Sequence, residues 1–215
     1  MTDINFIDRA KKYFGYLTSE YGFKLTNEAN SELRPQTDGM IEYQSTDIGI
    51  LIDSETGYVT VRFYRLQDGK KYYVTPIDIF EYLNTNAEEK KLLLSTNLAD
   101  KSVASKLFEE KFLLNQPGWK GSRGTVQDLD KELMNFSNWL KAHEHICLRH
   151  DIRLWSQLYE YKIHRARADH LRRGKNEIGY AQVRDSNGKW KLTQQSIFKD
   201  QLEHIEKLKN QFRDK

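Results

Sequence analysis

Candidate metal ligands cluster in the second half of the chain. Residues 143–150 read HEHICLRH and contain three histidines and the only cysteine of the protein. On one continuous helix, His143, Cys147 and His150 stand at positions i, i+4 and i+7 and share a face. Imidazole and thiolate are zinc ligands, and three of them leave an open catalytic position. The alternative is a turn between two helices with surface histidines and a half-buried cysteine. We expect no metal or other cofactor.

A basic stretch follows this cluster. From Arg149 to Lys175 the chain has eight Lys+Arg and three Asp+Glu. A helix with such a face can lie along nucleic acid phosphates. The alternative is a solvated helix face whose arginines pair with nearby acids. The candidate nucleic-acid-binding residues are Arg149, Arg153, Lys162, Arg165, Arg167, Arg172 and Arg173.

The apolar positions of this predicted helix are Leu148, Ile152, Trp155, Tyr159, Ile163 and Ala166. This stripe must face a core or a neighbouring helix. We therefore expect His164, Arg165 and Arg167 to point toward other faces, where long cationic side chains stay in water.

Two residues of the basic stretch, Arg165 and His170, are separated by four positions. The pair is similar to the arginine–histidine signature of HEPN-type ribonucleases. That resemblance implies that His170 acts in acid–base chemistry on an RNA phosphodiester, with Arg165 beside the phosphate. Ala166 departs from the pattern, because the family usually has a polar residue there. Arg165 and His170 are the candidate catalytic residues of this alternative.

A β-rich region at 40–65 is the clearest structural pattern in the first half. Apolar and polar residues alternate through Ile50, Ile52, Val59, Val61 and Phe63. This period of two is typical of antiparallel strands with one buried face. It predicts three strands, and a fourth follows at 71–74. Three acids at the strand turns are candidates for acid–base chemistry or for turn hydrogen bonds, namely Asp47, Asp53 and Glu55.

Helical periodicity surrounds this sheet. Thr2 or Asp3 caps a first helix that ends at Gly22, and a polar loop is expected over 26–39. Pro76 in the first turn marks a second helix that runs to Leu83. Further predicted elements are helices at about 86–95, 101–114 and from Thr125, a long helix Ile146–Arg173, a hairpin around Asn187-Gly188, and a last helix capped by Thr193.

Four phrases of the first half form a wider pattern: EYGF at 20–23, IEYQS at 41–45, GILID at 49–53 and GYVTV at 57–61. Their order over roughly residues 4–83 resembles a group of small uncharacterised bacterial α+β proteins. Some of that group are classed with toxin-immunity proteins. The resemblance implies a compact binding module and transfers no catalytic residue.

Composition limits the class of protein. The chain has no run of about 18 apolar residues, and its single cysteine suits a reducing compartment, so we expect a cytoplasmic protein with no membrane contact. Net charge is −5 over residues 1–100 and +8 over 101–215. Such a split suggests two regions with different partners.

These patterns predict an α+β fold, with an N-terminal helix on an antiparallel sheet of about four strands and a mainly helical C-terminal half with one hairpin at 178–192. Domains are expected at 1–114 and 125–215, joined by a linker at 115–124, or as one composite domain. We predict non-enzymatic binding of a macromolecular partner, with Trp119 of the linker as a contact. A protein is the expected partner, and a bacterial defence or toxin-neutralising role follows from the resemblance alone. The alternatives are a nucleic-acid-associated protein, a HEPN-like ribonuclease and a metal-dependent hydrolase.

Overall fold

The computed structural model describes residues 5–55, 57–85, 87, 126–149, 151–176, 178–184 and 189–213. The chain forms two compact units, each built from two separate segments. The first unit is Met1–Ile77 with Gly118–Asp151, and the second is Asp78–Pro117 with Ile152–Lys215. This division differs from the contiguous one at 114 and 125 that the sequence suggested.

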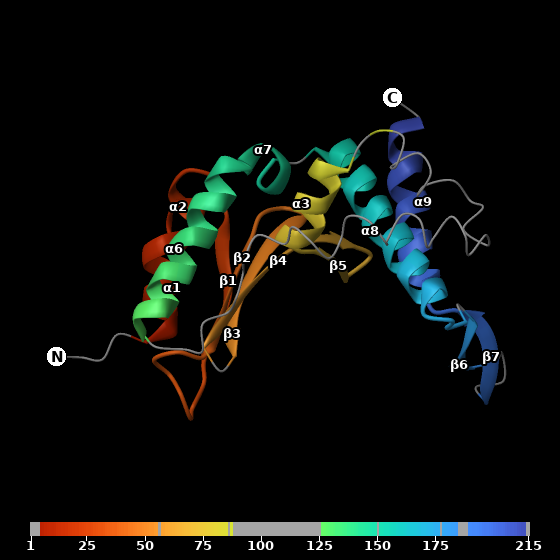
Figure 1. Ribbon diagram of the computed structural model, residues 1–215, viewed down its shortest axis with the longest axis horizontal. Coiled ribbons are helices and arrows are strands. Elements are labelled where there is room, and N and C mark those ends of the chain that lie inside the picture. Colours follow the sequence, from red (N-terminus) through yellow and green to blue (C-terminus); the bar gives the residue numbers. More distant parts are fainter. Residues whose placement is uncertain are drawn as a thin grey trace. The chain divides into compact units, whose positions relative to one another are not determined.

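The first unit contains a five-stranded antiparallel sheet and the helices that cover it (Figure 1). The strands follow one another in chain order from β1 to β5, so each connection is a hairpin. The elements of this unit are α1 (Phe6–Phe14), α2 (Tyr16–Ser19), β1 (Lys24–Asn30), β2 (Gly39–Gln44), β3 (Ile48–Glu55), β4 (Tyr58–Gln67), β5 (Lys70–Val74), α6 (Val126–Ala142) and α7 (Glu144–Cys147).

The register of the central strands places one apolar set on one face of the sheet. Tyr43 pairs with Ile50, Ile50 with Phe63, and Phe63 with Val74. All four are at most 2% exposed. The predicted strands are therefore confirmed, and this face forms the core of the first unit. The other face is not exposed throughout, because Leu51 and Tyr64 on it are also buried.

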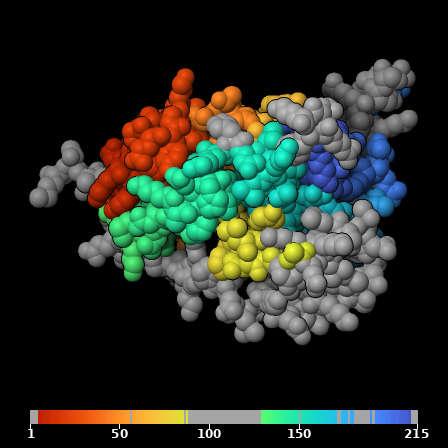
Figure 2. All heavy atoms as spheres, turned by 90° about the horizontal axis from the view of Figure 1, so that it is seen from above, coloured from red at the N-terminus to blue at the C-terminus, as the bar shows by residue number. Residues whose placement is uncertain are grey.

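Helix α6 closes that core together with α1. Its buried apolar residues are Leu129, Leu133, Phe136 and Leu140. Arg9 Nη1 lies 2.6 Å from Asp130 Oδ2, and Ser137 Oγ donates to the Tyr13 carbonyl at 2.7 Å. Figure 2 shows the atoms of α6 directly against those of α1 and α2. These contacts are the reason that a segment from the second half of the sequence belongs to the first unit.

The N-terminal elements differ in detail from the prediction. Asn5 caps α1 by accepting from the Asp8 N–H, and the helix breaks at Gly15 before α2. Gly22 has φ +69°, which agrees with its expected place after the helix. Residues 26–30, which were expected in a loop, belong to strand β1 (Lys24–Asn30). All seven of its side chains are exposed, so the edge strand has no alternation for a pattern to detect.

The described residues of the second unit form three helices and a two-stranded ribbon. They are α3 (Pro76–Asn84, of which Pro76 and Ile77 belong to the first unit), α8 (Ile152–Arg172), β6 (Ile178–Arg184), β7 (Trp190–Ser196) and α9 (Lys199–Arg213). The rings of Tyr159 and His204 lie edge to face at 5.0 Å between α8 and α9. Lys209 Nζ lies 2.5 Å from Glu160 Oε1 across the same pair of helices.

Two predictions for this half require correction. The long helix expected from Ile146 is broken, because α7 ends at Cys147 and α8 starts at Ile152. Apolar Leu148 and Ile152 flank the break, so the periodicity continues across it. Thr193 lies within β7 and does not cap the last helix, which starts at Lys199.

The remaining element predictions divide into two groups. The second helix and the hairpin are confirmed in outline by α3 and by the β6–β7 pairing. The predicted helix at about 86–95 lies outside the described residues except for residue 87. The predicted helix at 101–114, the linker 115–124 with Trp119, and the turn Asn187-Gly188 also lie outside them.

Buried tyrosines make the stability of the first unit depend on pH in the alkaline range. Burial raises the pKa of Tyr43 to about 12, with a smaller contribution from Glu28, and burial also raises the pKa values of Tyr16 and Tyr64. A raised pKa in the folded state contributes stability below the unfolded value of about 10, and this contribution is lost as the pH rises toward 12. Absorbance at 295 nm should show a late phenolate step that coincides with loss of circular dichroism. Complete tyrosine ionisation near pH 10 with the fold intact would contradict these raised pKa values.

Candidate functional site

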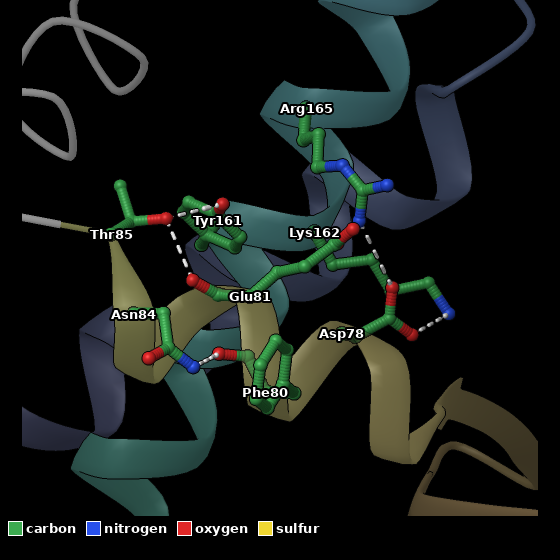
Figure 3. Close-up of polar contacts among 8 residues, drawn as sticks. All are labelled: Asp78, Phe80, Glu81, Asn84, Thr85, Tyr161, Lys162 and Arg165. Atoms are coloured by element: carbon green, nitrogen blue, oxygen red, sulfur yellow. Dashed lines mark hydrogen bonds and ion pairs between the residues drawn. The ribbon is translucent and has the colours of Figure 1, made fainter. Parts of the chain in front are cut away.

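The basic helix α8 meets α3 through a cluster of opposite charges (Figure 3). Lys162 Nζ lies 3.3 Å from Asp78 Oδ2. Arg165 forms an ion pair with Glu81 and has a second carboxylate, that of Asp78, at 4.0 Å. Only 9% of the Glu81 side chain and 25% of the Arg165 side chain are exposed. Two of the candidate nucleic-acid-binding cations therefore face acids of the same unit.

An aromatic contact lies beside these charges. The Tyr161 ring packs edge to face against Tyr82 at 5.6 Å. The Tyr161 hydroxyl lies 2.8 Å from Thr85 Oγ1, which donates to the Glu81 carbonyl at 2.7 Å (Figure 3). Tyr161 is 1% exposed, so the contact between α3 and α8 has a buried apolar part next to its ion pairs.

Nearby carboxylates keep the partly buried guanidinium of Arg165 charged. Burial lowers the pKa of the Arg165 guanidinium, and the charges of Asp78 and Asp169 raise it again. A buried cation is stable only when nearby acids compensate its lost hydration. Arg165 is thus a structural residue of the contact between α3 and α8.

His170 and Arg165 do not share a site in this arrangement. His170 Nε2 lies 2.8 Å from the Asn176 carbonyl, and its ring packs edge to face against Phe198. A separation of five residues corresponds to about 140° around a helix. Arg165 therefore contacts α3, whereas His170 contacts the segments that follow α8 and precede α9.

The other candidate cations lie in different settings. Arg149 precedes α8, in the first unit, and pairs with Glu144 at 3.2 Å. Arg153 is exposed and Arg167 half-buried. Arg173 pairs with Asp169 at 2.8 Å while 60% of its side chain stays exposed. Arg172 is the last residue of α8.

The predicted apolar stripe of α8 is only partly correct. Trp155, Tyr159 and Ile163 are buried, as expected. His164 is also buried, at 6% exposed, whereas Ala166 is exposed. Helix α8 buries more than one face because α3 and α9 both pack against it, so the expectation that His164 and Arg165 are solvated was wrong.

The candidate zinc ligands lie around the break before α8. The His143 ring stacks on Trp139 at 4.4 Å, and its Nδ1 lies 2.8 Å from the Trp139 carbonyl. Cys147 is 6% exposed, and burial raises the pKa of its thiol. His150 lies outside the described residues. Among those that are described, no three His, Cys, Asp or Glu side chains are placed to hold a metal ion.

Sequence reasoning missed a polar cluster on the second face of the sheet. The Tyr64 hydroxyl donates to Glu42, whose Oε1 also lies 2.5 Å from Lys71 Nζ. Lys71 Nζ stands 4.7 Å from the centre of the Tyr64 ring. Burial and the bond to Glu42 raise the pKa of Tyr64, so this hydroxyl stays protonated and holds the carboxylate. Gly49, opposite Tyr64 in the register, provides the space for the ring. Only the register brings these residues together.

Two of the three acids at the strand turns, Asp47 and Asp53, form ion pairs with different arginines. Asp47 pairs with Arg65, which is 6% exposed, and Asp53 Oδ1 accepts from Arg62 at 2.8 Å. Glu55 is exposed at the end of β3. Asp47 and Asp53 therefore neutralise arginines of β4.

Comparisons with known proteins add no family to this geometry. No family model matches the chain, and neither curated proteins nor solved structures gave a match. The helices within the described part of the chain include none with the length and apolar character needed to cross a membrane.

Proposed function

We propose that this protein is a non-enzymatic binding protein that engages a macromolecular partner, with the β6–β7 ribbon as its contact surface. This proposal is based on the exposure of large apolar side chains on the ribbon. Ile178 is 57% exposed and Leu192 is 70% exposed, and Ile197 just after β7 is 46% exposed. Large apolar side chains at such exposure are typical of contact surfaces when they gather on one element.

The ribbon's architecture supports the same proposal. Its two strands pair over seven positions, from Ile178 with Ser196 to Arg184 with Trp190. A two-stranded ribbon is at best marginally stable alone in water, and a third strand or a packed partner stabilises it. Thr193 and Leu192, which point to opposite faces, are both exposed.

The placement of the candidate catalytic pair also favours binding over RNA cleavage. Arg165 forms an ion pair with Glu81, and His170 Nε2 lies within hydrogen-bonding distance of the Asn176 carbonyl. A cytoplasmic bacterial setting and a toxin-neutralising role are part of the proposal through the family resemblance described above.

The test is capture of the partner from native extract. Two double variants compare exposed apolar positions: Ile178→Ser with Leu192→Ser on the ribbon, and Leu25→Ser with Met134→Ser in the first unit. Surface changes of this kind alter stability by roughly 0.5 kcal/mol or less. We expect a stoichiometric complex whose recovery falls with salt and is lost in the ribbon variant only. Equal recovery with both variants would contradict the proposal.

A further inference from the structure

Several cations of the second unit form ion pairs with acids of the same unit. In the middle of α8, Lys162 and Arg165 face Asp78 and Glu81. Glu160 of the same helix is matched by Lys209 of α9. These pairs neutralise one another within the fold.

The excess positive charge lies farther along the chain, where α8 ends and the ribbon begins. Residues 172–191 contain six Lys+Arg and two Asp+Glu. Lys175 and Lys189 are exposed, and 60% of the Arg173 side chain is exposed beside Asp169. The cations of this segment are Arg172, Arg173, Lys175, Arg184, Lys189 and Lys191. We call the described residues 172–176, 178–184 and 189–196 the basic arm.

The shape of the basic arm fits duplex DNA. Paired strands lie about 4.8 Å apart, and the major groove of B-DNA is about 12 Å wide, so a two-stranded ribbon enters it. Exposed Thr193 and Gln194 supply hydrogen-bonding groups for base edges or phosphates. Exposed Leu192 supplies an apolar contact of the kind that thymine methyl groups make.

We propose that the basic arm binds duplex DNA, with the ribbon in the major groove and the flanking cations on the phosphates. This inference rests on the proposed function, whose contact surface it shares, and names the class of partner. It narrows the stretch Arg149–Lys175, which the sequence indicated as the binding region, to its last cations and extends the surface into the ribbon that follows α8.

The test is fluorescence anisotropy of the full chain with a labelled 20-base-pair DNA at several salt concentrations. The arm variant combines Arg173→Gln, Lys175→Gln and Lys189→Gln, three cations whose side chains are exposed. The control combines Lys24→Gln, Lys70→Gln and Lys131→Gln, which are exposed lysines of the first unit with the same change in net charge. Removing each phosphate contact lowers the slope of log affinity against log salt by about 1. We expect the arm variant to lose about tenfold or more in affinity and about 3 from the slope, and the control to stay within about twofold.

Three results would overturn the proposal. Absence of saturable DNA binding at low salt is the first, and an equal loss in both triple variants is the second. The third is tighter binding of a 20-nucleotide single-stranded RNA than of the duplex. If DNA binding fails while a nuclease-resistant protein complex still depends on Ile178 and Leu192, this inference falls and the proposed function stands. If neither complex forms, both fall.

Discussion

A fragment that ends at residue 114 will not unfold cooperatively, because it lacks the helix that closes the core of the first unit. Four α6 side chains, Leu129, Leu133, Phe136 and Leu140, are at most 7% exposed. Burial of such side chains contributes roughly 1.5–3 kcal/mol each, or about 6–12 kcal/mol together. A typical domain is stable by only about 5–15 kcal/mol. Urea denaturation followed by circular dichroism should therefore show a broad, non-cooperative change.

The matched control is a fragment ending at residue 151, which retains both segments of the first unit. We expect a single cooperative transition for this longer fragment. A cooperative transition of the shorter fragment would contradict the assignment of α6 to the core. It would support the contiguous domain at 1–114 that the sequence predicted.

The second large effect is expected from Glu81→Gln. The substitution keeps the shape of the side chain but removes the carboxylate that pairs with Arg165. Breaking a buried ion pair leaves an uncompensated charge and costs about 3–5 kcal/mol. Asp78 remains at 4.0 Å and a quarter of Arg165 is exposed, so we expect a loss near the lower end, about 3 kcal/mol, in the free energy of unfolding.

Glu203→Gln on α9 is the control for this change. Glu203 Oε1 lies 3.9 Å from Lys199 Nζ, and both side chains are more than half exposed. Exposed pairs of this kind contribute roughly 0–1 kcal/mol. Urea titration of the two variants should give clearly different midpoints. Equal midpoints would show that the ion pair at Glu81 has no structural role.

The sequence was informative where burial follows a short period. The alternation through Ile50, Ile52 and Phe63 predicted the strands of the sheet, and Pro76 marked the start of α3. Residues 26–30 of β1 were expected in a loop because all seven side chains of this strand are exposed, so no alternation of burial distinguishes its polar residues from a loop.

The polar contacts could not be predicted from the sequence, because they join residues that are far apart in it. Arg165 lies 84 positions from Glu81 in the sequence, and neither residue type indicates burial. Charge density along α8 therefore predicted an open basic face, whereas α3 neutralises its centre. Glu42, Tyr64 and Lys71 meet only through the register of β2 to β5, which no local pattern specifies.

We propose that the cations in the middle of α8 support the fold, whereas those of the basic arm bind the partner. Titration of Arg165→Gln with the 20-base-pair DNA tests it most directly, at a temperature where the variant is folded. We expect an affinity within about twofold of the unmodified protein, because Arg165 faces Asp78 and Glu81 and only a quarter of its side chain is exposed. A loss of affinity as large as that of the arm variant would contradict the claim and return the binding face to α8.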